Sequence, residues 1–509
     1  MFSAHISPDF QLFPTDWSVL VPEGSMARFL SDIIDGLNLK ALLDTYSAEG
    51  HPGYNPVMML KTVIFGYLHN IFSTRELEEA IRRDIQLLWL TGLQFPDHTT
   101  ISRFKSRCSP IIKDIFSQLT MELARRGEID LQGDLYIDGT TVRSASCRYR
   151  IVWRRNSERL GALADEAIQE GMRSLLDQID NGINQDIGPA RKEKYTPEEA
   201  RSIAKAIGDS ADRRGVKGLR GKLRKVTEAC DRKERHDRDL KACGERAGMS
   251  PTDPECGIMK AKEDGYKADA TPNYNVQAAT QNQYVTNYGA YDTSSDKAVS
   301  LGFTDQCIQE NGVKPSSVVE DAGYGGEEQY VTLEGKGIEA VVKYRDFDRQ
   351  LSMHNRGESI TDREGFRLTE DGEGIYCPAM KRLRIVGTEN RANKSGFGTV
   401  VTFFTCEQCG ECPLAASCKL QKNKSHVIER TLEALRQERK AFERLTKPEN
   451  LEKLRRRSLE PEPVFGNLKH NKGYKRVRHY GKAKVEMDLG LVFMSMNIAK
   501  LYRKLNKTA

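Results

Sequence analysis

Three acidic residues stand where metal-assisted chemistry on phosphate groups would need them. Asp138 follows the apolar run of "LYIDG", and Asp321 follows the apolar run of "SVVEDAGYGG". In open α/β sheets, sites form at the carboxyl ends of the strands, and a hard cation such as Mg²⁺ takes oxygen ligands. For Asp138 a plain turn is the alternative, because Asp-Gly is a common turn pair. The two segments together predict a metal site at strand ends.

The third acid, Glu462, lies in a basic segment near the C-terminus. Glu462 and Lys469 are seven residues apart, about two turns of α-helix, so both are expected on one side of the helix. From Lys469 to Lys484 the chain has seven Lys or Arg residues and no acid. A carboxylate beside such a run suits a metal site next to phosphates. The alternative is a basic surface helix with a structural Glu.

Each of the last two acids has a rival next to it. Glu460 competes with Glu462, which is preferred for its spacing to Lys469. Glu320 competes with Asp321, but its side chain is expected on the opposite face of the strand end. In the basic segment, the residues expected to contact DNA are Lys469, Lys472, Tyr474, Lys475, Arg476 and Arg478.

The elements before these segments are predicted to be helical up to about residue 120. "STRELEEAI" begins with a capping box, Ser73 to Glu76, and "TISRFKSRC" resumes helical spacing after a break with Gly and Pro. Arg103, Lys105 and Arg107 lie on that last helix. Helix, turn and basic helix form the outline of a helix-turn-helix DNA reader. A helical bundle with a solvated basic face fits equally well.

Beyond residue 150 the pattern changes twice. Residues 151–265 are charged and poor in aromatics, which predicts solvated or coiled-coil-like helices. "NYNVQAATQNQYVTNYGAY" predicts a hairpin of strands. The segment around Asp321 adds a strand, a helix and another strand, an alternation that is typical of α/β folds. Residues 346–424 are predicted to be a strand-and-loop insertion, and the C-terminal part helical and basic.

Most of the clustered cysteines fall in that strand-and-loop insertion. They are Cys377, Cys406, Cys409, Cys412 and Cys418. Two thiolate pairs on separate turns would form a tetrahedral Zn²⁺ site, and a loop of free cysteines is the alternative. An iron–sulfur cluster is disfavoured because the run lacks the C-x3-C-P ending. The odd total of 11 cysteines fits reduced thiols.

The bulk properties exclude some classes of protein. A length of 509 residues suggests two to four compact units. No early segment resembles a signal peptide, and no apolar run reaches the roughly 18 residues that span a bilayer. We therefore expect a soluble protein of the cytoplasm. The formal net charge of +6 is modest, but its concentration in two segments points to nucleic acid.

Four segments, in this order, resemble DDE transposases of bacterial insertion sequences. "YIDGTTVRSAS", "VVEDAGYGG" and "EPVFGNLKHNKGYKRVRHYG" are similar to the family's three catalytic segments. The front segment, from "HPGYNPVMML" to "HTTISRF", is similar to the N-terminal helical domain of the insertion-sequence 1182 type branch. The family's last segment often reads Tyr-x2-Arg-x3-Glu-x6-Lys. Here the Arg position falls on Ser458, just after Arg457, so the role of the arginine is unassigned.

The resemblance implies an α/β fold, with an RNase H-like catalytic core formed by residues 126–150, 266–345 and 425–509. The helical segment 151–265 and the cysteine-bearing segment 346–424 would be insertions, and residues 1–125 an all-helical DNA-binding domain. Asp138, Asp321 and Glu462 would be the catalytic acids holding Mg²⁺ or Mn²⁺.

The implied partners are double-stranded DNA, as terminal inverted repeats and target, and a second copy of the chain, with the protein at the bacterial nucleoid. The implied activity is DNA transposition by strand cleavage and strand transfer. The alternatives are a metal-dependent nuclease without strand transfer and a catalytically inactive DNA-binding protein.

Overall fold

The computed structural model of the chain describes residues 17–46, 53–180, 192–213, 218–261, 269–393, 395–407, 409, 412–415, 418 and 427–508. The chain divides into two compact units. Unit 1 comprises Met1–Thr141, Asn275–Arg478 and Ala483–Ala509, and unit 2 comprises Val142–Tyr274 and His479–Lys482. Among the described residues, no helix combines the length and apolar character needed to cross a membrane.

Unit 1 begins with short helices, as the apolar periodicity predicts. They are η1 (Trp17–Leu20), α1 (Met26–Asp35), α2 (Lys40–Leu43), α3 (Pro56–Leu68), α4 (Thr74–Ile81), α5 (Ile85–Thr91), α6 (His98–Cys108) and α7 (Ile112–Arg125). The expected cap of α4 is present, because the side chain of Ser73 accepts the N–H of Glu76 at 3.5 Å. Asp97 caps α6 in the same way, accepting the N–H of Thr100 at 2.6 Å.

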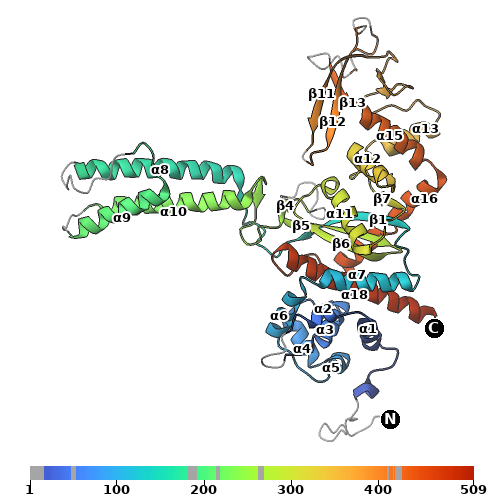
Figure 1. Cartoon of the computed structure of the whole chain (residues 1–509), viewed down its shortest axis with the longest axis horizontal. Helices are drawn as coiled ribbons and strands as arrows, with labels where there is room; N and C mark the ends of the chain where they lie inside the picture. Colours follow the sequence, from blue (N-terminus) through green and yellow to red (C-terminus); the bar gives the residue numbers. More distant parts are fainter. Residues whose placement is uncertain are drawn as a thin grey trace, which may run out of the picture. The chain divides into compact units, whose positions relative to one another are not determined.

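The centre of unit 1 is a mixed sheet (Figure 1). Its strands are β1 (Asp134–Arg143), β5 (Thr271–Gln281), β6 (Tyr284–Tyr291), β7 (Ser317–Glu320) and β8 (Glu339–Val342), and the short β4 (Gly257–Met259) also pairs with β5. The spatial order is β6-β5-β1-β7-β8, with β5 and β6 antiparallel and β1, β7 and β8 parallel. β5 and β6 form the predicted hairpin, and Asn282 and Gln283 take positive φ angles in its tight turn. Every residue of β5 is buried, which suits a strand inside the sheet.

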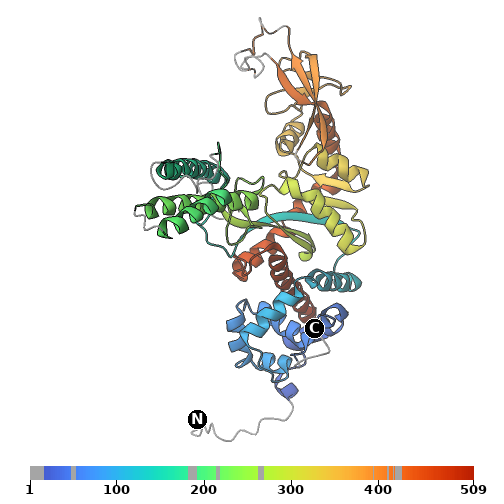
Figure 2. The same cartoon turned by 60° about the vertical axis from the view of Figure 1, so that its left-hand side comes forward.

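Helices flank the sheet and fix its ends. They are α11 (Asp296–Asn311), α12 (Glu327–Gly335), α15 (Leu432–Leu445), α16 (Pro448–Arg457), α17 (Pro461–Gly466), the π-helix η3 (Asn467–Asn471) and α18 (Lys482–Thr508). α7 and α18 meet at Tyr288 of β6, whose ring centroid lies 4.9 Å from that of Phe116 and 5.6 Å from that of Phe493. α18 runs as one long helix, drawn in dark red in Figure 2.

The predicted strand-and-loop insertion is also part of unit 1. It contains α13 (Phe347–Asn355), β9 (Arg367–Leu368), β10 (Ile375–Tyr376), β11 (Arg384–Ala392), β12 (Gly398–Thr405) and β13 (Ile428–Thr431). β11, β12 and β13 form an antiparallel sheet, and β9 pairs with β10. Its small core includes Phe404, Ile375, Cys377 and Cys418.

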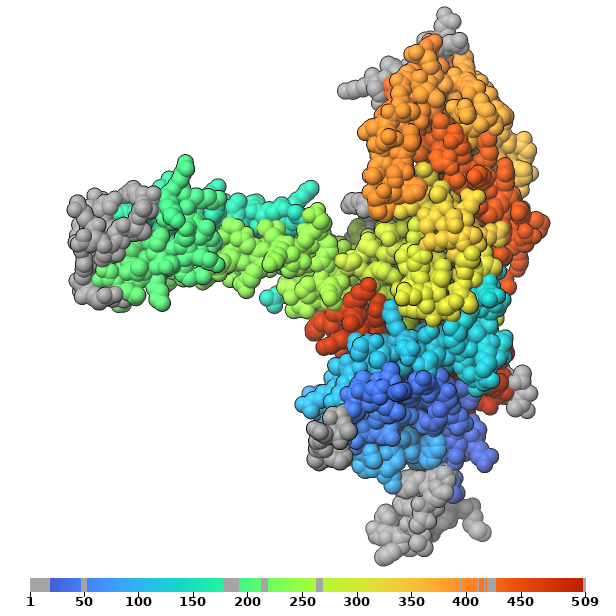
Figure 3. All heavy atoms as spheres, in the orientation of Figure 1, coloured from blue at the N-terminus to red at the C-terminus, as the bar shows by residue number. Residues whose placement is uncertain are grey.

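Unit 2 contains the predicted charged helices, which form α8 (Arg154–Asp180), α9 (Pro197–Arg213) and α10 (Arg220–Cys243). They lie side by side (Figure 1, Figure 3) and share a core that includes Ile168, Met172 and Val226. The short strands β2 (Val152–Trp153), β3 (Gly248–Met249) and β4 (Gly257–Met259) lie where the chain enters and leaves these helices. These charged helices therefore have an apolar core of their own.

Candidate acidic site

Asp138 lies on β1, and Asp321 directly follows the end of its parallel neighbour β7. The register pairs Tyr136 of β1 with Val319 of β7. Asp138 and Asp321 each follow two residues later, and β7 ends at Glu320, one residue before Asp321. If the register continued through Asp321, the alternation of side chains along a strand would send both carboxylates to one face of the sheet. The fold thus brings onto neighbouring strands two segments whose acids are 183 positions apart in the chain.

Asp138 is not at a strand tip, which corrects the sequence prediction. β1 continues through Arg143, so Gly139 is a strand residue rather than a turn residue. β7 ends at Glu320, so the site forms where the shorter strand stops beside the longer one. Asp321, just past that end, accepts the N–H of Gly323 at 2.7 Å.

Glu320 has the opposite orientation to Asp321, as strand alternation requires. Its side chain is fully buried, where the Ser300 hydroxyl donates to one oxygen and the Gln329 amide donates to the other at 2.7 Å. Burial raises the pKa of Glu320 to about 8, against the lowering effect of these hydrogen bonds. Glu320 therefore ties α11 and α12 to the sheet and does not share the face of Asp138.

A fourth carboxylate, Asp296, lies against the backbone next to Asp138. One oxygen of Asp296, at the start of α11, accepts the amide N–H groups of Asn275 and Gln277, both at 2.8 Å. A methyl carbon on Gly139 would lie 2.6 Å from that oxygen and 2.2 Å from the amide nitrogen of Gln277. A larger residue at position 139 would therefore displace the ends of these two side chains and disturb their hydrogen bonds.

Tyr324 completes the layer beneath the acids. Its buried hydroxyl donates to Gln277 at 2.8 Å. Burial raises the pKa of Tyr324 well above its usual range, and the charges of Asp296, Asp138, Glu320 and Asp321 raise it further. The Tyr324 hydroxyl therefore stays protonated and holds Gln277, which in turn donates to Asp296.

Arg457 connects Glu462 to this site. Its two terminal nitrogens lie 3.7 Å from a carboxylate oxygen of Asp138 and 3.5 Å from one of Glu462. The nitrogen nearest Asp138 is buried and has no hydrogen-bond partner at that distance. Glu462 is 55% exposed, and Asp138 only 14%. One guanidinium thus neutralises two acids that come from opposite ends of unit 1's sequence.

Glu460 has a different environment from Glu462. It is buried at the start of α17, accepts the backbone N–H of Gln283 at 2.7 Å, and lies 3.6 Å from Arg456. Burial is the main effect on Glu460 and raises its pKa. Glu460 therefore holds α17 against the β5–β6 turn, whereas Glu462 shares a cation with Asp138.

Lys469 does not share the exposure of Glu462. The helix changes from α to π between them, since α17 ends at Gly466 and η3 runs from Asn467 to Asn471. A π-turn holds more residues than an α-turn, so a seven-residue spacing no longer returns to the same side. Lys469 is buried in η3.

The residues expected to contact DNA divide into two groups. Exposed side chains belong to Arg103, Arg107, Lys475, Arg476 and Arg478. Buried side chains belong to Lys105, Lys469, Lys472 and Tyr474. For the buried group the placement corrects the expectation, because a side chain inside the protein does not reach a DNA duplex.

Three of these buried residues join the N-terminal helices to the segment after Glu462. The ammonium of Lys105 lies 2.9 Å from Asp488 of α18 and donates to the Tyr67 hydroxyl at 2.6 Å. The hydroxyls of Tyr67 and Tyr474 also donate to Asp488, which is fully buried. Lys472 donates to the backbone carbonyl of Tyr67 at 2.7 Å, at the carboxyl end of α3, where a cation is favourable.

The five clustered cysteines, which form no disulfide within the described residues, all line one space of about 10 Å³. Even so, in the described part of the chain no group of three or more His, Cys, Asp or Glu side chains is arranged to hold a metal ion. The zinc site expected from Cys377, Cys406, Cys409, Cys412 and Cys418 and the metal site expected from Asp138, Asp321 and Glu462 therefore both lack support from side-chain geometry.

Two family models match separate parts of the chain. The model described as "Transposase DDE domain" matches residues 376–502, which include Arg457 and Glu462. The model described as "Transposase domain (DUF772)" matches residues 15–107, which include α1 to α5 and most of α6. No curated protein and no solved structure matches the chain. The two matches indicate a DDE transposase of an insertion sequence.

Proposed function

We propose that this chain is a transposase of the insertion-sequence 1182 type branch that binds the terminal inverted repeats of its element, cuts the DNA there and transfers the ends to target DNA. The observation that carries the proposal is the position of Arg457, which lies 3.7 Å from Asp138 and 3.5 Å from Glu462. Asp321 directly follows β7, the parallel neighbour of the strand that carries Asp138. The strand order β6-β5-β1-β7-β8 supports an RNase H-like core.

The donor set suits a divalent cation in chemical type. Carboxylates are the ligands that Mg²⁺ and Mn²⁺ prefer, and the guanidinium of Arg457 already places positive charge within 4 Å of Asp138 and Glu462. Asp138, Asp321 and Glu462 would hold the ion once the guanidinium and the exposed Glu462 side chain rearrange. A bound ion supplies charge stabilisation to a phosphate and helps to generate the nucleophile.

The protein's own residues would orient this chemistry. Asp296, Gln277 and Tyr324 fix the backbone beside Asp138, so that its carboxylate keeps one position. The exposed cations of α6 and of residues 475–478 would bind phosphates along the duplex, with affinity that falls as salt rises. Sequence reading is proposed for the N-terminal helices, and pairing of two element ends for a complex of at least two copies.

The test is cleavage of a labelled duplex taken from the ends of the DNA element that encodes the chain, in MgCl₂. We expect Asp138→Asn, Asp321→Asn and Glu462→Gln to bind this duplex but to cut it on the order of a hundredfold more slowly or worse, because each loses a charge that stabilises the transition state. Glu460→Gln is the matched control: its amide oxygen still accepts the N–H of Gln283, so cutting should persist.

The same reaction distinguishes the alternatives. A pre-cut end with a free 3′-hydroxyl, mixed with supercoiled plasmid, should give joined products if the chain performs strand transfer. Cutting without joining would favour a nuclease instead. If the wild type and Asp138→Asn both bind the duplex and neither cuts it, an inactive DNA-binding protein would be favoured. Cutting by Glu462→Gln but not by Glu460→Gln would reassign the third acid.

A further inference from the structure

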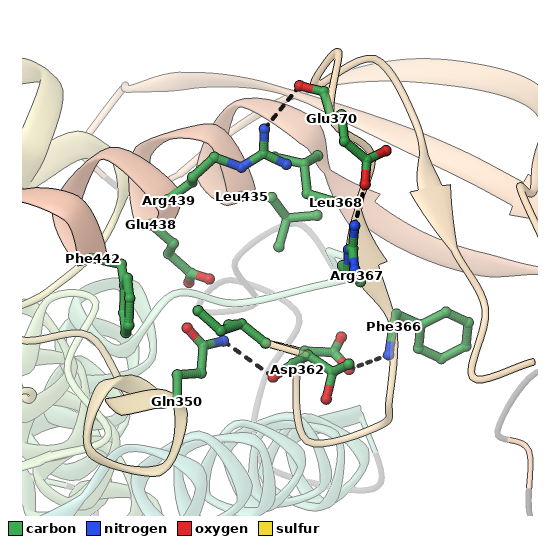
Figure 4. Close-up of a pocket in the computed structure, with 12 residues that line it drawn as sticks. Gln350, Asp362, Phe366, Arg367, Leu368, Glu370, Leu435, Glu438, Arg439 and Phe442 are labelled. Carbon is green, nitrogen blue, oxygen red and sulfur yellow. Dashed lines mark hydrogen bonds and ion pairs between the residues drawn. The ribbon is translucent and has the colours of Figure 1, made fainter. Parts of the chain in front are cut away.

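A cavity of about 470 Å³ lies in the strand-and-loop insertion, apart from the acidic site. It is enclosed by α13, the loop that follows it, β9 and α15 (Figure 4). Its volume is within the usual range for sites that bind small molecules. Its apolar wall is formed by Ile360, Phe366, Leu368, Leu435 and Phe442.

Most charged side chains that line the cavity already have partners. Asp362 pairs with Arg430 at 2.9 Å, and Arg367 pairs with Glu370. The guanidinium of Arg439 donates to the backbone carbonyls of residues 369 and 370. These groups are neutralised or held by the protein itself, so they do not call for a ligand.

Glu438 is different. Within the described residues its carboxylate has no hydrogen bond and no ion pair, and Figure 4 shows it pointing into the cavity beside Phe442 and Gln350. The amide of Gln350 is itself occupied, since it accepts the hydroxyl of Tyr344 at 2.6 Å and donates to the carbonyl of Thr361 at 3.2 Å. Glu438 is thus a charged group of this cavity that has no partner within the described residues.

The surroundings of Glu438 make its negative charge costly. Burial raises the pKa of its carboxyl to about 7, and the charges of Asp346 and Asp362 act in the same direction while Arg430 opposes them. An anion in the cavity would add repulsion, and a purely apolar molecule would leave the carboxylate without a partner. A cation on an apolar stem satisfies both the carboxylate and the apolar wall.

We infer that this cavity binds a small organic cation, an ammonium or guanidinium group on an apolar stem, with Glu438 as its counter-charge. The inference is independent of the proposed function, because no residue of the cavity belongs to the acidic site.

Isothermal titration of the full chain with n-pentylammonium tests it, with n-pentanol and pentanoate as the neutral and anionic counterparts of equal length. We expect only the ammonium to bind, and to bind at least about tenfold more weakly to Glu438→Gln, the loss expected for a charge-assisted contact. Glu443→Gln is the matched control, since Glu443 is exposed on the same helix. Melting temperatures of both variants verify that they fold.

The pH dependence gives a second readout. Binding of the ammonium should weaken as the pH falls through about 7, because Glu438 takes up a proton there, and this slope should vanish in Glu438→Gln. The nearby titratable groups are Asp346, Asp362 and His354, whose ring lies 5.5 Å from that of Phe442. Equal binding of pentanol and pentylammonium, equal binding by wild type and Glu438→Gln, or a pH slope that survives in Glu438→Gln would each overturn the inference.

Discussion

Replacing Lys105 by Met should loosen the N-terminal helices more than any exposed substitution in α6. Lys105 is 2% exposed and Asp488 is fully buried, with 2.9 Å between their charged atoms. The hydroxyls of Tyr67 and Tyr474 also donate to the Asp488 carboxylate, but neither carries the positive charge that the ammonium supplies. Breaking a buried pair on one side costs about 3–5 kcal/mol, because the other charge stays buried.

That energy corresponds to about a hundredfold or greater increase in local opening. Hydrogen exchange of the backbone amides of α3 and α6 measures it directly, without requiring two-state unfolding of the whole chain. Arg103→Met is the matched control on the same helix: Arg103 is exposed, so its loss should change stability by about 0.5 kcal/mol or less.

A double variant tests the cause. Lys105→Met combined with Asp488→Asn removes both charges, while the Asn oxygen still accepts the two tyrosine hydroxyls. We expect it to recover about 2–3 kcal/mol relative to the sum of the two single variants. If Lys105→Met opens α3 and α6 no more than Arg103→Met does, or if the double variant is as unstable as the sum, the buried pair does not hold these helices.

Three further substitutions test other parts of the site. Gly139→Ala places a methyl group 2.2 Å from the amide of Gln277; thermal unfolding should show a loss of about 1–3 kcal/mol, and wild-type stability would contradict the packing argument. Arg457→Met removes a cation that competes for two carboxylates, so Mn²⁺ titration should show about two- to fivefold tighter binding, whereas weaker binding would mean that Arg457 organises the acids. Burial lowers the pKa of Lys472 to about 8. As the pH falls from about 10.5 to about 8, Lys472 therefore takes up its proton in the unfolded chain before it does so in the folded one, and the wild type loses up to about 3 kcal/mol of folding stability. Lys472→Met should gain stability relative to the wild type across that pH range, and parallel pH profiles of the two proteins would refute this.

The helices and strands of the core follow from patterns that the sequence displays. Apolar periodicity predicts the N-terminal helices, and Ser73 caps α4 as the capping box requires. The burial of Lys105 could also have been predicted from the sequence. Ile101, Phe104 and Cys108 define the apolar face of α6, and position 105 is one turn after Ile101 on that face. Its pairing with Asp488 could not have been predicted, because no local sequence pattern connects residues 383 positions apart.

The site was predictable in composition but not in detail. From the sequence, Gly139 resembles a turn residue. In the structure, a side chain of β5 occupies the space beside it. The two-turn spacing of Glu462 and Lys469 assumes an unbroken α-helix, and the π-helix η3 alters it. Arg457 lies in α16 and Glu462 in α17. A break separates these helices, so no helical period could place them together.

The buried contact between Lys105 and Asp488 also sets an order of events during synthesis. At about 5–20 residues per second, a ribosome adds the 383 positions between them in roughly 20–80 seconds. Throughout that interval the N-terminal helices lack the carboxylate that neutralises Lys105. The packing of α6 against α18 is therefore completed only after the last helix of the chain has been made.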